Sequence, residues 1–428
     1  MIEKVKSMAG ICPTCGRNHA LVTGEIVIGP DATEQLITYI EKNSHTCVII
    51  CDTNTEKYAR RIQSAAIAHV FVLPEYSHAT EITTAATAEF ASPLKPDLFI
   101  ACGSGSIHDI VRYVACQMNV PFVSYPTAAS VDGFVSGVAA MTWHGQKLTF
   151  SAKAPVAVFA DDDVYAQAPA RLTASGAADI LGKYTALADW RIAHRMTGEH
   201  LCEAIYQLEK DALDAVKETI LHRDECTAAE YARRIMEGLL LSGLAMQLQG
   251  NSRPASGAEH HLSHFWEMHL IHPEIDALHG EAVGVGLVQV LTLYHSLYRR
   301  RSIMTDAFFR PDLAKVFDRA YLEEVFGALT DGILDENMPD GMASSSLSHI
   351  EVENPLIADS QIRQVLADLP TPDEARNLLR LCGAPDALSQ IGLPEDDDFL
   401  MRSLNYAPYV RNRLTLMKMM SAETVTVQ

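Results

Sequence analysis

Asp179, His260 and His279 have the residue types of a divalent metal site, with His264 close to His260. His260 and His264 are four residues apart and therefore share one face of a helix. Asp179 falls early in a separate apolar stretch of helical periodicity, and His279 precedes a glycine at the expected start of a third helix. One carboxylate and two imidazoles suit Zn²⁺ or a similar ion and leave coordination positions open for a substrate. The pattern therefore predicts metal-assisted chemistry.

A second interpretation competes with the metal site. The chain has 17 histidines, and a single histidine on a helix is more often a surface or hydrogen-bonded core residue than a ligand. Four other histidines of this region are expected to be such bystanders: His261, His269, His272 and His295. Periodicity alone leaves both interpretations open for His260, His264 and His279.

A glycine turn in the first half of the chain predicts a dinucleotide site. The segment GSGSIHD (103–109) follows an apolar strand and precedes a helical stretch, so backbone and helix N–H groups can approach a pyrophosphate. Its spacing differs from the Rossmann G-x-G-x-x-G, and an ordinary strand–helix turn fits it as well. A second run of small residues lies at a strand end within 123–137 and is expected to line the same groove: Thr127, Ser130, Gly133, Ser136 and Gly137. Asp52 ends an earlier strand and is a candidate for binding ribose hydroxyls, or for capping the next helix.

The elements that would position these residues change in character near residues 166–170. Before this point, apolar runs alternate with helical stretches, as in parallel βαβ units. The expected strands fall within 47–55, 69–75, 96–106, 120–130 and 155–165. After it, stretches such as 203–221 and 227–248 have helical periodicity. We expect an α/β nucleotide-binding domain with a parallel sheet over 1–168 and an all-helical metal- and substrate-binding domain over 169–428.

Composition excludes several classes of protein. The formal net charge of −20 argues against a nucleic-acid surface, which needs clustered Lys and Arg. The sequence shows neither a signal peptide nor an apolar run long enough to span a membrane, so we expect a cytoplasmic protein. Its nine cysteines are then expected to be free thiols. Cys12 and Cys15 form a Cys-x-x-Cys pair, but a second such pair is absent, so two free thiols are favoured over a zinc site.

Five motifs in this order resemble the sn-glycerol-1-phosphate dehydrogenase family, in particular its bacterial, arabinose-operon-associated form: GSGSIHD, TAASVDGFVS, SGAADILGKYTALADW, SRPASGAEHHLSH and LHGEAVGVG. That family is grouped with iron-containing alcohol dehydrogenases, glycerol dehydrogenases and dehydroquinate synthases, and the likeness covers roughly residues 45–295. It implies a dehydroquinate-synthase-like fold, a homodimer, and reversible reduction of dihydroxyacetone phosphate by NADH or NADPH. It also implies zinc or, in bacterial members, nickel.

The resemblance assigns roles to individual residues. It implies that Asp179, His260 and His279 bind the metal, that Asp132, Asp179 and His264 contact the substrate, and that Asp179 and His264 act in catalysis. The residues implied to contact the dinucleotide are Asp52, Gly103, Ser104, Gly105, Ser106, Ile107, Thr127, Ala128, Ala129, Ser130 and Ser136. One departure is Ser104, where many relatives have glycine; serine fits there if its φ is negative. Lys183 and Arg253 are candidates for the substrate phosphate, or else solvated surface cations.

Three alternatives remain open. A dehydrogenase of glycerol or another polyol would use the same machinery without a phosphate pocket. A dehydroquinate-synthase-like lyase is disfavoured, because those enzymes resemble this chain but have Glu at the position of Asp179. A regulator that binds nucleotide and metal without turnover is the non-enzymatic alternative.

Overall fold

A parallel sheet organises the N-terminal half of the protein. The computed structural model describes residues 2–63, 68–273, 275–300 and 304–427, and in this part of the chain the sheet has six strands in the order β3-β10-β7-β6-β4-β5. The strands are β3 (Glu25–Ile28), β4 (Cys47–Asp52), β5 (Ala68–Leu73), β6 (Leu98–Gly103), β7 (Phe122–Pro126) and β10 (Ala157–Ala160). All pairs are parallel. The five strands expected from apolar runs are therefore confirmed, and β3 is an addition.

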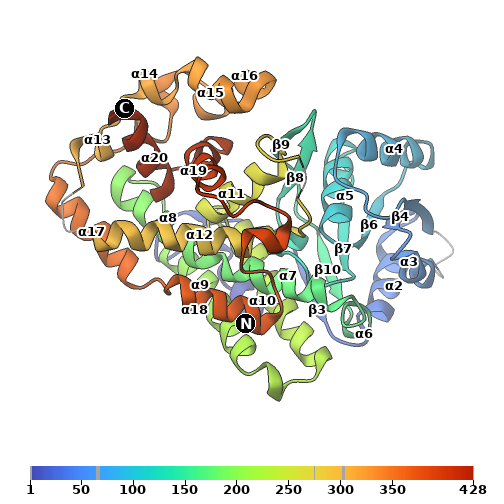
Figure 1. Ribbon diagram of the computed structural model, residues 1–428. Coiled ribbons are helices and arrows are strands. Elements are labelled where there is room, and N and C mark those ends of the chain that lie inside the picture. Colours follow the sequence, from blue (N-terminus) through green and yellow to red (C-terminus); the bar gives the residue numbers. More distant parts are fainter. Residues whose placement is uncertain (1, 64–67, 274, 301–303, 428) are drawn as a thin grey trace. The chain divides into compact units, whose positions relative to one another are not determined.

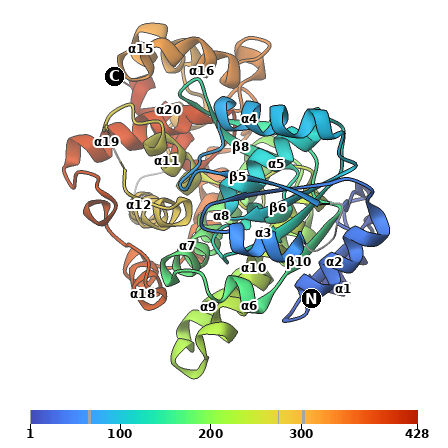
Figure 2. The ribbon, with the colours of Figure 1, turned by 90° about the vertical axis from the view of Figure 1, so that its right-hand side faces the viewer.

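Helices cover both faces of this sheet. Side chains of α2 (Ala32–Asn43) and α3 (Glu56–Ile62) pack with alternate residues of β4, β6 and β7 on one face. Those of α4 (Glu81–Ala91) and α5 (Gly105–Gln117) pack on the other face. Figure 2 shows α4 and α5 above the strands and α3 below them. Burial on both faces explains why these strands are apolar throughout, without alternation.

Two antiparallel hairpins accompany the sheet. The strands β8 (Val138–Trp143) and β9 (Gln146–Ser151) are joined by His144 and Gly145, both with positive φ, as in a type I′ hairpin turn. The second hairpin is formed by β1 (Gly10–Ile11) and β2 (Asn18–His19). Neither hairpin was expected from the sequence.

The chain divides into two packing units, which are described separately. Unit 1 comprises Met1–Ile180 and Gln207–Ser252, and unit 2 comprises Leu181–Tyr206 and Arg253–Gln428. The first unit therefore includes helices that follow the sheet in sequence. They are α6 (Asp162–Tyr165), α7 (Ala170–Leu181) except its last residue, most of α9 (Glu203–Leu221), and α10 (Ala228–Gln249), in addition to α1 (Ile2–Lys6) at the N-terminus. The predicted domain division at 168/169 stays a prediction, because packing units and functional domains need not share boundaries.

Unit 2 is helical in its described residues, as expected. Its core surrounds α8 (Lys183–Thr197), α11 (Ala258–Glu267), α12 (His279–Arg299), α17 (Pro355–Ala367) and α20 (Leu416–Val427). The remaining helices are α13 (Asp306–Phe309), α14 (Leu313–Val316), α15 (Arg319–Phe326), α16 (Thr330–Asn337), α18 (Pro372–Cys382) and α19 (Asp397–Tyr406). Figure 1 shows α12 as a long helix of this unit. The α/β plus all-helical fold class predicted from the sequence is confirmed.

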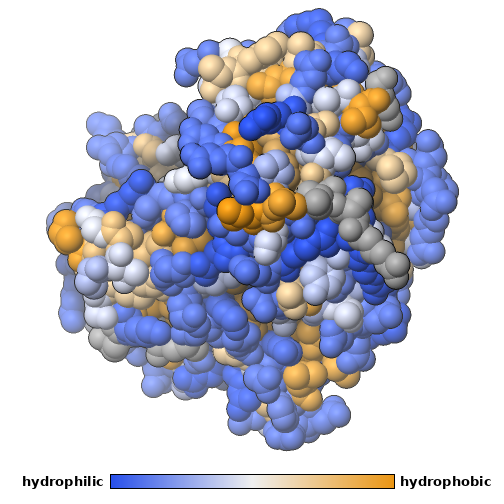
Figure 3. Space-filling view, turned by 90° about the vertical axis from the view of Figure 1, so that its left-hand side faces the viewer, coloured by the Kyte–Doolittle hydropathy of each residue, from blue (hydrophilic) through white to orange (hydrophobic). Residues whose placement is uncertain are grey.

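One face of the molecule is largely polar. On the face in Figure 3, hydrophobic residues form small groups among hydrophilic ones. Among the described residues, no helix combines the length and apolar character that crossing a membrane requires. All nine cysteines lie in the described part of the chain, and none of them forms a disulfide there.

Candidate active site

Three histidines predicted to be functional lie together in unit 2. The ring centroids are 5.9 Å apart for His260 and His264, 5.3 Å for His260 and His279, and 5.6 Å for His264 and His279. His260 and His264 lie one turn apart on α11, and His279 is the first residue of α12. Ligand nitrogens of His260 and His279 come within 4.8 Å of each other. The packing of two helices therefore converts a sequence separation of nineteen residues (279 minus 260) into one imidazole cluster.

A glycine brings these two helices close. A Cβ built on Gly286 of α12 would lie 2.8 Å from the backbone oxygen of Glu259 on α11. Only glycine allows such an approach, because a methyl group there would push the helices apart. The close contact holds the start of α12, and with it His279, beside α11.

Asp189 fixes the start of α11. Its carboxylate accepts hydrogen bonds from the backbone N–H of Ala258 at 2.9 Å and of Leu416 at 2.8 Å, and from the hydroxyl of Tyr294 at 2.7 Å. Complete burial raises the pKa of Asp189 to about 7, although the hydrogen bonds from Leu416 and Tyr294 oppose this shift. One buried side chain thus ties α8, α11, α12 and α20 together around the histidines. The sequence pattern did not point to this residue.

Two glutamates orient the predicted metal ligands. The Nδ1 of His260 lies 2.8 Å from Glu259 Oε1, and the Nδ1 of His279 lies 3.2 Å from Glu267 Oε1. A carboxylate accepts, so each Nδ1 donates and the lone pair of each neutral imidazole is on Nε2. Metal-binding histidines commonly have such a carboxylate partner, which fixes the tautomer and the ring orientation. The chemistry of these donors therefore fits a divalent metal.

Glu259 is itself held in its charged form. Burial alone would raise the pKa of Glu259, but hydrogen bonds from His260, from the Thr185 hydroxyl and from the Gly257 N–H at 2.7 Å outweigh this effect and lower it. A fixed, charged acceptor keeps the His260 ring in one orientation. Sequence reasoning named His260 but not Glu259 beside it.

We expect Glu259→Gln to weaken metal binding. An amide accepts more weakly than a carboxylate, so the variant should lose roughly 10- to 100-fold in metal affinity while keeping the fold. Competition with a chelator, followed by elemental analysis, measures this loss. Glu267→Gln should act in the same direction through His279, and unchanged affinity in both variants would contradict the orienting role.

His264 has the properties of a substrate contact. Burial lowers its pKa well below the ordinary value, so the imidazole is neutral at pH 7. Its Nδ1 is buried and has no hydrogen-bond partner among the described residues. A buried nitrogen without a hydrogen bond has lost its contact with water, which costs free energy unless a ligand forms a hydrogen bond with it. One N–H and one lone pair let this ring donate to a carbonyl oxygen or accept from a hydroxyl.

Asp179 and Asp132 meet in unit 1. Asp179 is fully buried near the end of α7, and its Oδ2 accepts a hydrogen bond from the Asp132 backbone N–H at 3.1 Å. The Asp132 carboxylate in turn accepts from the Ser242 hydroxyl of α10 at 2.9 Å. Two carboxylates predicted to bind metal and substrate are therefore held by backbone and hydroxyl donors rather than exposed to water. Ser242 was not expected from the sequence.

The predicted dinucleotide segments lie at the carboxyl ends of neighbouring strands. Gly103 ends β6, Thr127 follows β7, and Asp52 ends β4, and β6 lies between the other two strands. The chain passes from β4 to β5 on one side and returns with β6 on the other, so the strand order reverses between β4 and β6. Ligands of open α/β sheets bind at such a switch point, outside the carboxyl ends of the strands. This topology matches the sequence prediction of a nucleotide site.

The glycine turn itself has little room. A Cβ on Gly103 would lie 2.6 Å from the Ile107 side chain, and one on Gly105 3.0 Å from Val131. Ser104 has φ −87°, so serine is accommodated as expected. The Thr127 N–H donates to the Gly103 carbonyl at 3.1 Å and joins this turn to the second segment. Thr127, Ala128, Ala129, Ser130 and Ser136 are all buried.

His108 forms hydrogen bonds that hold this turn in place. It is fully buried, with Nδ1 2.9 Å from the Ser104 carbonyl oxygen and Nε2 2.8 Å from the Ser124 hydroxyl. A carbonyl only accepts, so Nδ1 carries the proton and Nε2 accepts from the hydroxyl. Burial lowers the pKa of His108 to about 3. A neutral imidazole therefore fixes Ser104, a role that the motif alone did not reveal.

We expect this histidine to make the protein less stable as the pH falls. Between pH 6.5, the ordinary pKa of histidine, and about pH 3, the unfolded chain binds a proton that folded His108 excludes. The free energy of unfolding therefore falls as the pH is lowered through this range. The slope from this group approaches about 1.4 kcal/mol per pH unit. Urea unfolding from about pH 7 to about pH 5 measures it. His108→Asn should reduce the slope, and an unchanged slope would refute the assignment.

Asp52 forms a local turn. Its Oδ1 accepts from the N–H and hydroxyl of Thr55, both at 2.9 Å, and the Thr55 hydroxyl also lies 3.1 Å from the Cys102 carbonyl oxygen. The carboxylate thus shapes the connection to α3, but the N-cap of that helix is Thr55, so the alternative interpretation of Asp52 as the helix cap is wrong. Its predicted contact with the ribose stays a prediction.

The two basic candidates for the substrate phosphate are not surface groups. Lys183 and Arg253 are both buried, which rules out the interpretation as solvated surface cations. Arg253 lies 2.9 Å from Glu199 Oε1 and donates to the carbonyls of Asp189 and Leu414. These contacts give Arg253 a structural role in unit 2. Contact with a phosphate stays a prediction for both residues.

The chain resembles known dehydrogenases along almost its whole length. The family of iron-containing alcohol dehydrogenases matches residues 27–169. A glycerol-1-phosphate dehydrogenase [NAD(P)+] of Bacillus licheniformis is 40% identical over 311 residues, which are 69% of this chain and 77% of that protein. The enzyme of the same name from Geobacillus stearothermophilus is 31% identical over 430 residues, covering 97% and 96%.

A solved structure has the same fold. Sulfoacetaldehyde reductase from Bifidobacterium kashiwanohense, in complex with NAD+, aligns with a TM-score of 0.60 at 16% identity, covering 96% of this chain and 97% of that one. At this identity the likeness concerns the fold alone. Both sequence relatives have a higher identity, and the Geobacillus enzyme is matched over nearly the full length of both chains. The chain therefore belongs to the glycerol-1-phosphate dehydrogenase family.

Proposed function

We propose that this protein is an NAD(P)-dependent sn-glycerol-1-phosphate dehydrogenase that reduces dihydroxyacetone phosphate reversibly. The single observation that carries the proposal is the histidine cluster, in which two rings are oriented by glutamates and a third is neutral with an unsatisfied nitrogen. Relatives that match nearly the whole chain are named for this reaction.

The proposed metal ligands are Asp179, His260 and His279. The support is their match to the family motifs, the orientation of both histidine rings, and the burial of Asp179. A divalent metal bound by these residues would act as a Lewis acid toward the substrate carbonyl oxygen. Zinc and nickel both suit a carboxylate with two imidazoles, and we propose one such ion per chain.

His264 and Asp132 are the proposed substrate contacts. The neutral His264 ring can donate its proton toward the carbonyl oxygen when negative charge develops there, and can accept a hydroxyl proton in the reverse direction. The Asp132 carboxylate is held by Ser242 and can accept from a substrate hydroxyl. Both residues therefore orient a small polyol-like substrate by its oxygens.

The proposed dinucleotide contacts come from the two segments at the strand ends. Backbone N–H groups of Gly103 through Ile107 open α5 and can bind a pyrophosphate, while Thr127 through Ser130, with Ser136, form the second wall. Asp52 is the proposed ribose contact. A nicotinamide bound there would supply the hydride. We also propose a cytoplasmic homodimer, following the family resemblance.

A polyol dehydrogenase is the alternative within the same superfamily, and kinetics separate the two. We expect kcat/KM for sn-glycerol 1-phosphate to exceed that for glycerol by at least about 10²-fold, because a buried phosphate contact is worth several kcal/mol. Initial rates of NAD(P)H formation with the two substrates provide the ratio. Equal values would overturn the phosphate specificity while leaving a dehydrogenase.

A further inference from the structure

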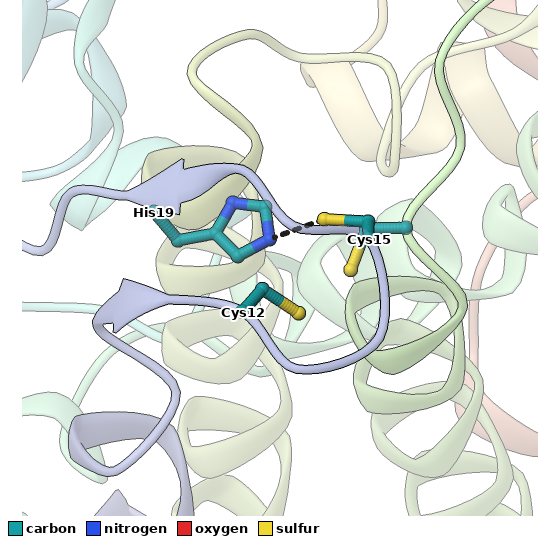
Figure 4. A group of neighbouring side chains, drawn as sticks. Cys12, Cys15 and His19 are labelled. Atoms are coloured by element: carbon teal, nitrogen blue, oxygen red, sulfur yellow. Dashed lines mark hydrogen bonds between the residues drawn. The ribbon is translucent and has the colours of Figure 1, made fainter.

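The Cys-x-x-Cys pair near the N-terminus lies beside a histidine in the folded protein. Cys12 and Cys15 are in the loop between β1 and β2, and His19 ends β2. Cys15 Sγ lies 3.3 Å from His19 Nε2, and the ligand atoms of all three residues are within 4.8 Å of one another. Figure 4 shows the two thiols and the imidazole gathered at this loop. None of the three belongs to the proposed catalytic set.

The backbone of this loop is folded so that both thiols reach the same point. Gly16 follows Cys15 with φ +73°, a conformation that other residues rarely adopt, and its N–H donates to the Cys12 carbonyl at 2.9 Å. The Cys12 N–H donates to the Arg17 carbonyl at 2.8 Å. The chain then enters β2, where His19 pairs with Gly10. A tight turn and a two-residue strand therefore place three donor side chains together.

This hairpin is too small to be stable by itself. Each of its strands has two residues, whereas isolated two-stranded hairpins are marginal even when longer. Ile11, the last residue of β1, is 75% exposed, so it adds little to a core. Cys12 and His19 are nevertheless buried. Small segments without a sufficient core are commonly stabilised by a disulfide or a metal ion.

The donor set favours a metal over a disulfide. A Cys12–Cys15 disulfide would use both sulfur atoms and give His19 no role, and the cysteines form no disulfide in the structure. Two thiolates and an imidazole are typical ligands of structural zinc, and their two negative charges neutralise the ion. We propose that Cys12, Cys15 and His19 are three protein ligands of a structural zinc ion that fastens the β1–β2 hairpin. The sequence favoured free thiols because it offered no second Cys-x-x-Cys pair, and the third donor is a histidine four residues after Cys15.

Metal content of the full-length protein tests this site without relying on catalysis. We expect elemental analysis to find one zinc ion that is lost in C12S/C15S and retained in His279→Ala. Cys226→Ser is the matched control, since Cys226 is a half-buried cysteine of the same unit, and it should keep the zinc. X-ray absorption of the wild-type protein should show at least two Zn–S distances of about 2.3 Å.

Two further measurements apply even if the double variant does not fold. His19→Cys replaces one zinc ligand by another and should retain the ion, whereas His19→Ala should lose affinity at least roughly 10-fold. In the wild-type protein, alkylation followed by mass spectrometry should label Cys12 and Cys15 only after chelation. Full zinc content in folded C12S/C15S, a spectrum without Zn–S distances, or a Cys12–Cys15 disulfide in the purified protein would each overturn the proposal. Loss of dehydrogenase activity alone would concern the proposed function and not this site.

Discussion

His279→Ala is expected to abolish turnover and to remove the catalytic metal while leaving the fold intact. His279 is the first residue of α12, is oriented by Glu267, and lies beside His260. Loss of one of three proposed protein ligands should reduce kcat by at least roughly 10³-fold, which corresponds to about 4 kcal/mol of transition-state stabilisation. Steady-state kinetics, metal analysis and circular dichroism on the same preparation measure the three effects.

A matched control separates this effect from general loss of histidine. His222 is exposed and follows α9 directly; its Nδ1 lies 2.9 Å from the Glu218 carbonyl oxygen and 3.8 Å from the Glu218 carboxylate. His222→Ala should keep full activity and metal content. Because side-chain truncation at the first residue of a helix costs little, the melting temperature of His279→Ala measured without metal should match that of the metal-free wild type. A metal-replete, fully active His279→Ala would contradict the ligand assignment.

Gly176→Ala is expected to destabilise unit 1 and to weaken dinucleotide binding. A Cβ at this position would lie 2.2 Å from the backbone oxygen of Ala129 and 2.9 Å from the Leu239 side chain. Ala129 belongs to the second proposed cofactor segment, so relief of the clash must move that segment or α7. Overpacking of this kind costs roughly 1–3 kcal/mol, and we expect the upper end because the obstacle is backbone. KM for the dinucleotide should rise about 10-fold or more.

The sign of this effect is informative. Gly176 is inside α7, where helix propensity alone would make alanine stabilising by about 1 kcal/mol. Only the close approach of Ala129 reverses this expectation. Gly24→Ala is the control, since a Cβ there meets nothing within 4 Å, and it should leave both the unfolding free energy and KM unchanged. Urea unfolding measures the change in stability, and cofactor titration measures the change in dinucleotide binding. A Gly176→Ala variant as stable as the wild type would refute the packing argument.

Most sheet strands were predictable because a strand buried on both faces appears in the sequence as a continuous apolar run. The run at 47–55 contains β4, Cys47–Asp52, whose first five residues are buried. Edge strand β3 (EIVI) offers only three consecutive apolar residues, and β9 (QKLTFS) alternates polar with apolar residues, so long apolar runs revealed neither β3 nor the β8–β9 hairpin. In the structure, the positive φ angles of His144 and Gly145 identify the turn of this hairpin.

Only the site residues that belong to recognisable sequence motifs were predictable. Residue types and spacing made Asp179 and His279 candidates together with the pair His260 and His264, and the family resemblance assigned a role to each. The residues that orient them, Glu259 and Glu267, are ordinary helix residues in sequence, and their roles follow from packing in three dimensions. The same holds for His108 beneath the glycine turn, which any helical pattern would accept as a core or surface position.

The most direct test of the proposed reaction is the absorbance of NADH and NADPH with dihydroxyacetone phosphate and the metal-replete protein. A dehydrogenase with the proposed metal site should oxidise at least one of the two cofactors, produce sn-glycerol 1-phosphate in equal amount, and lose this activity on chelation. A lyase that regenerates its cofactor within each turnover, or a regulator that binds without turnover, would leave the absorbance unchanged. An unchanged absorbance with both cofactors, zinc or nickel being bound, would contradict the proposed function.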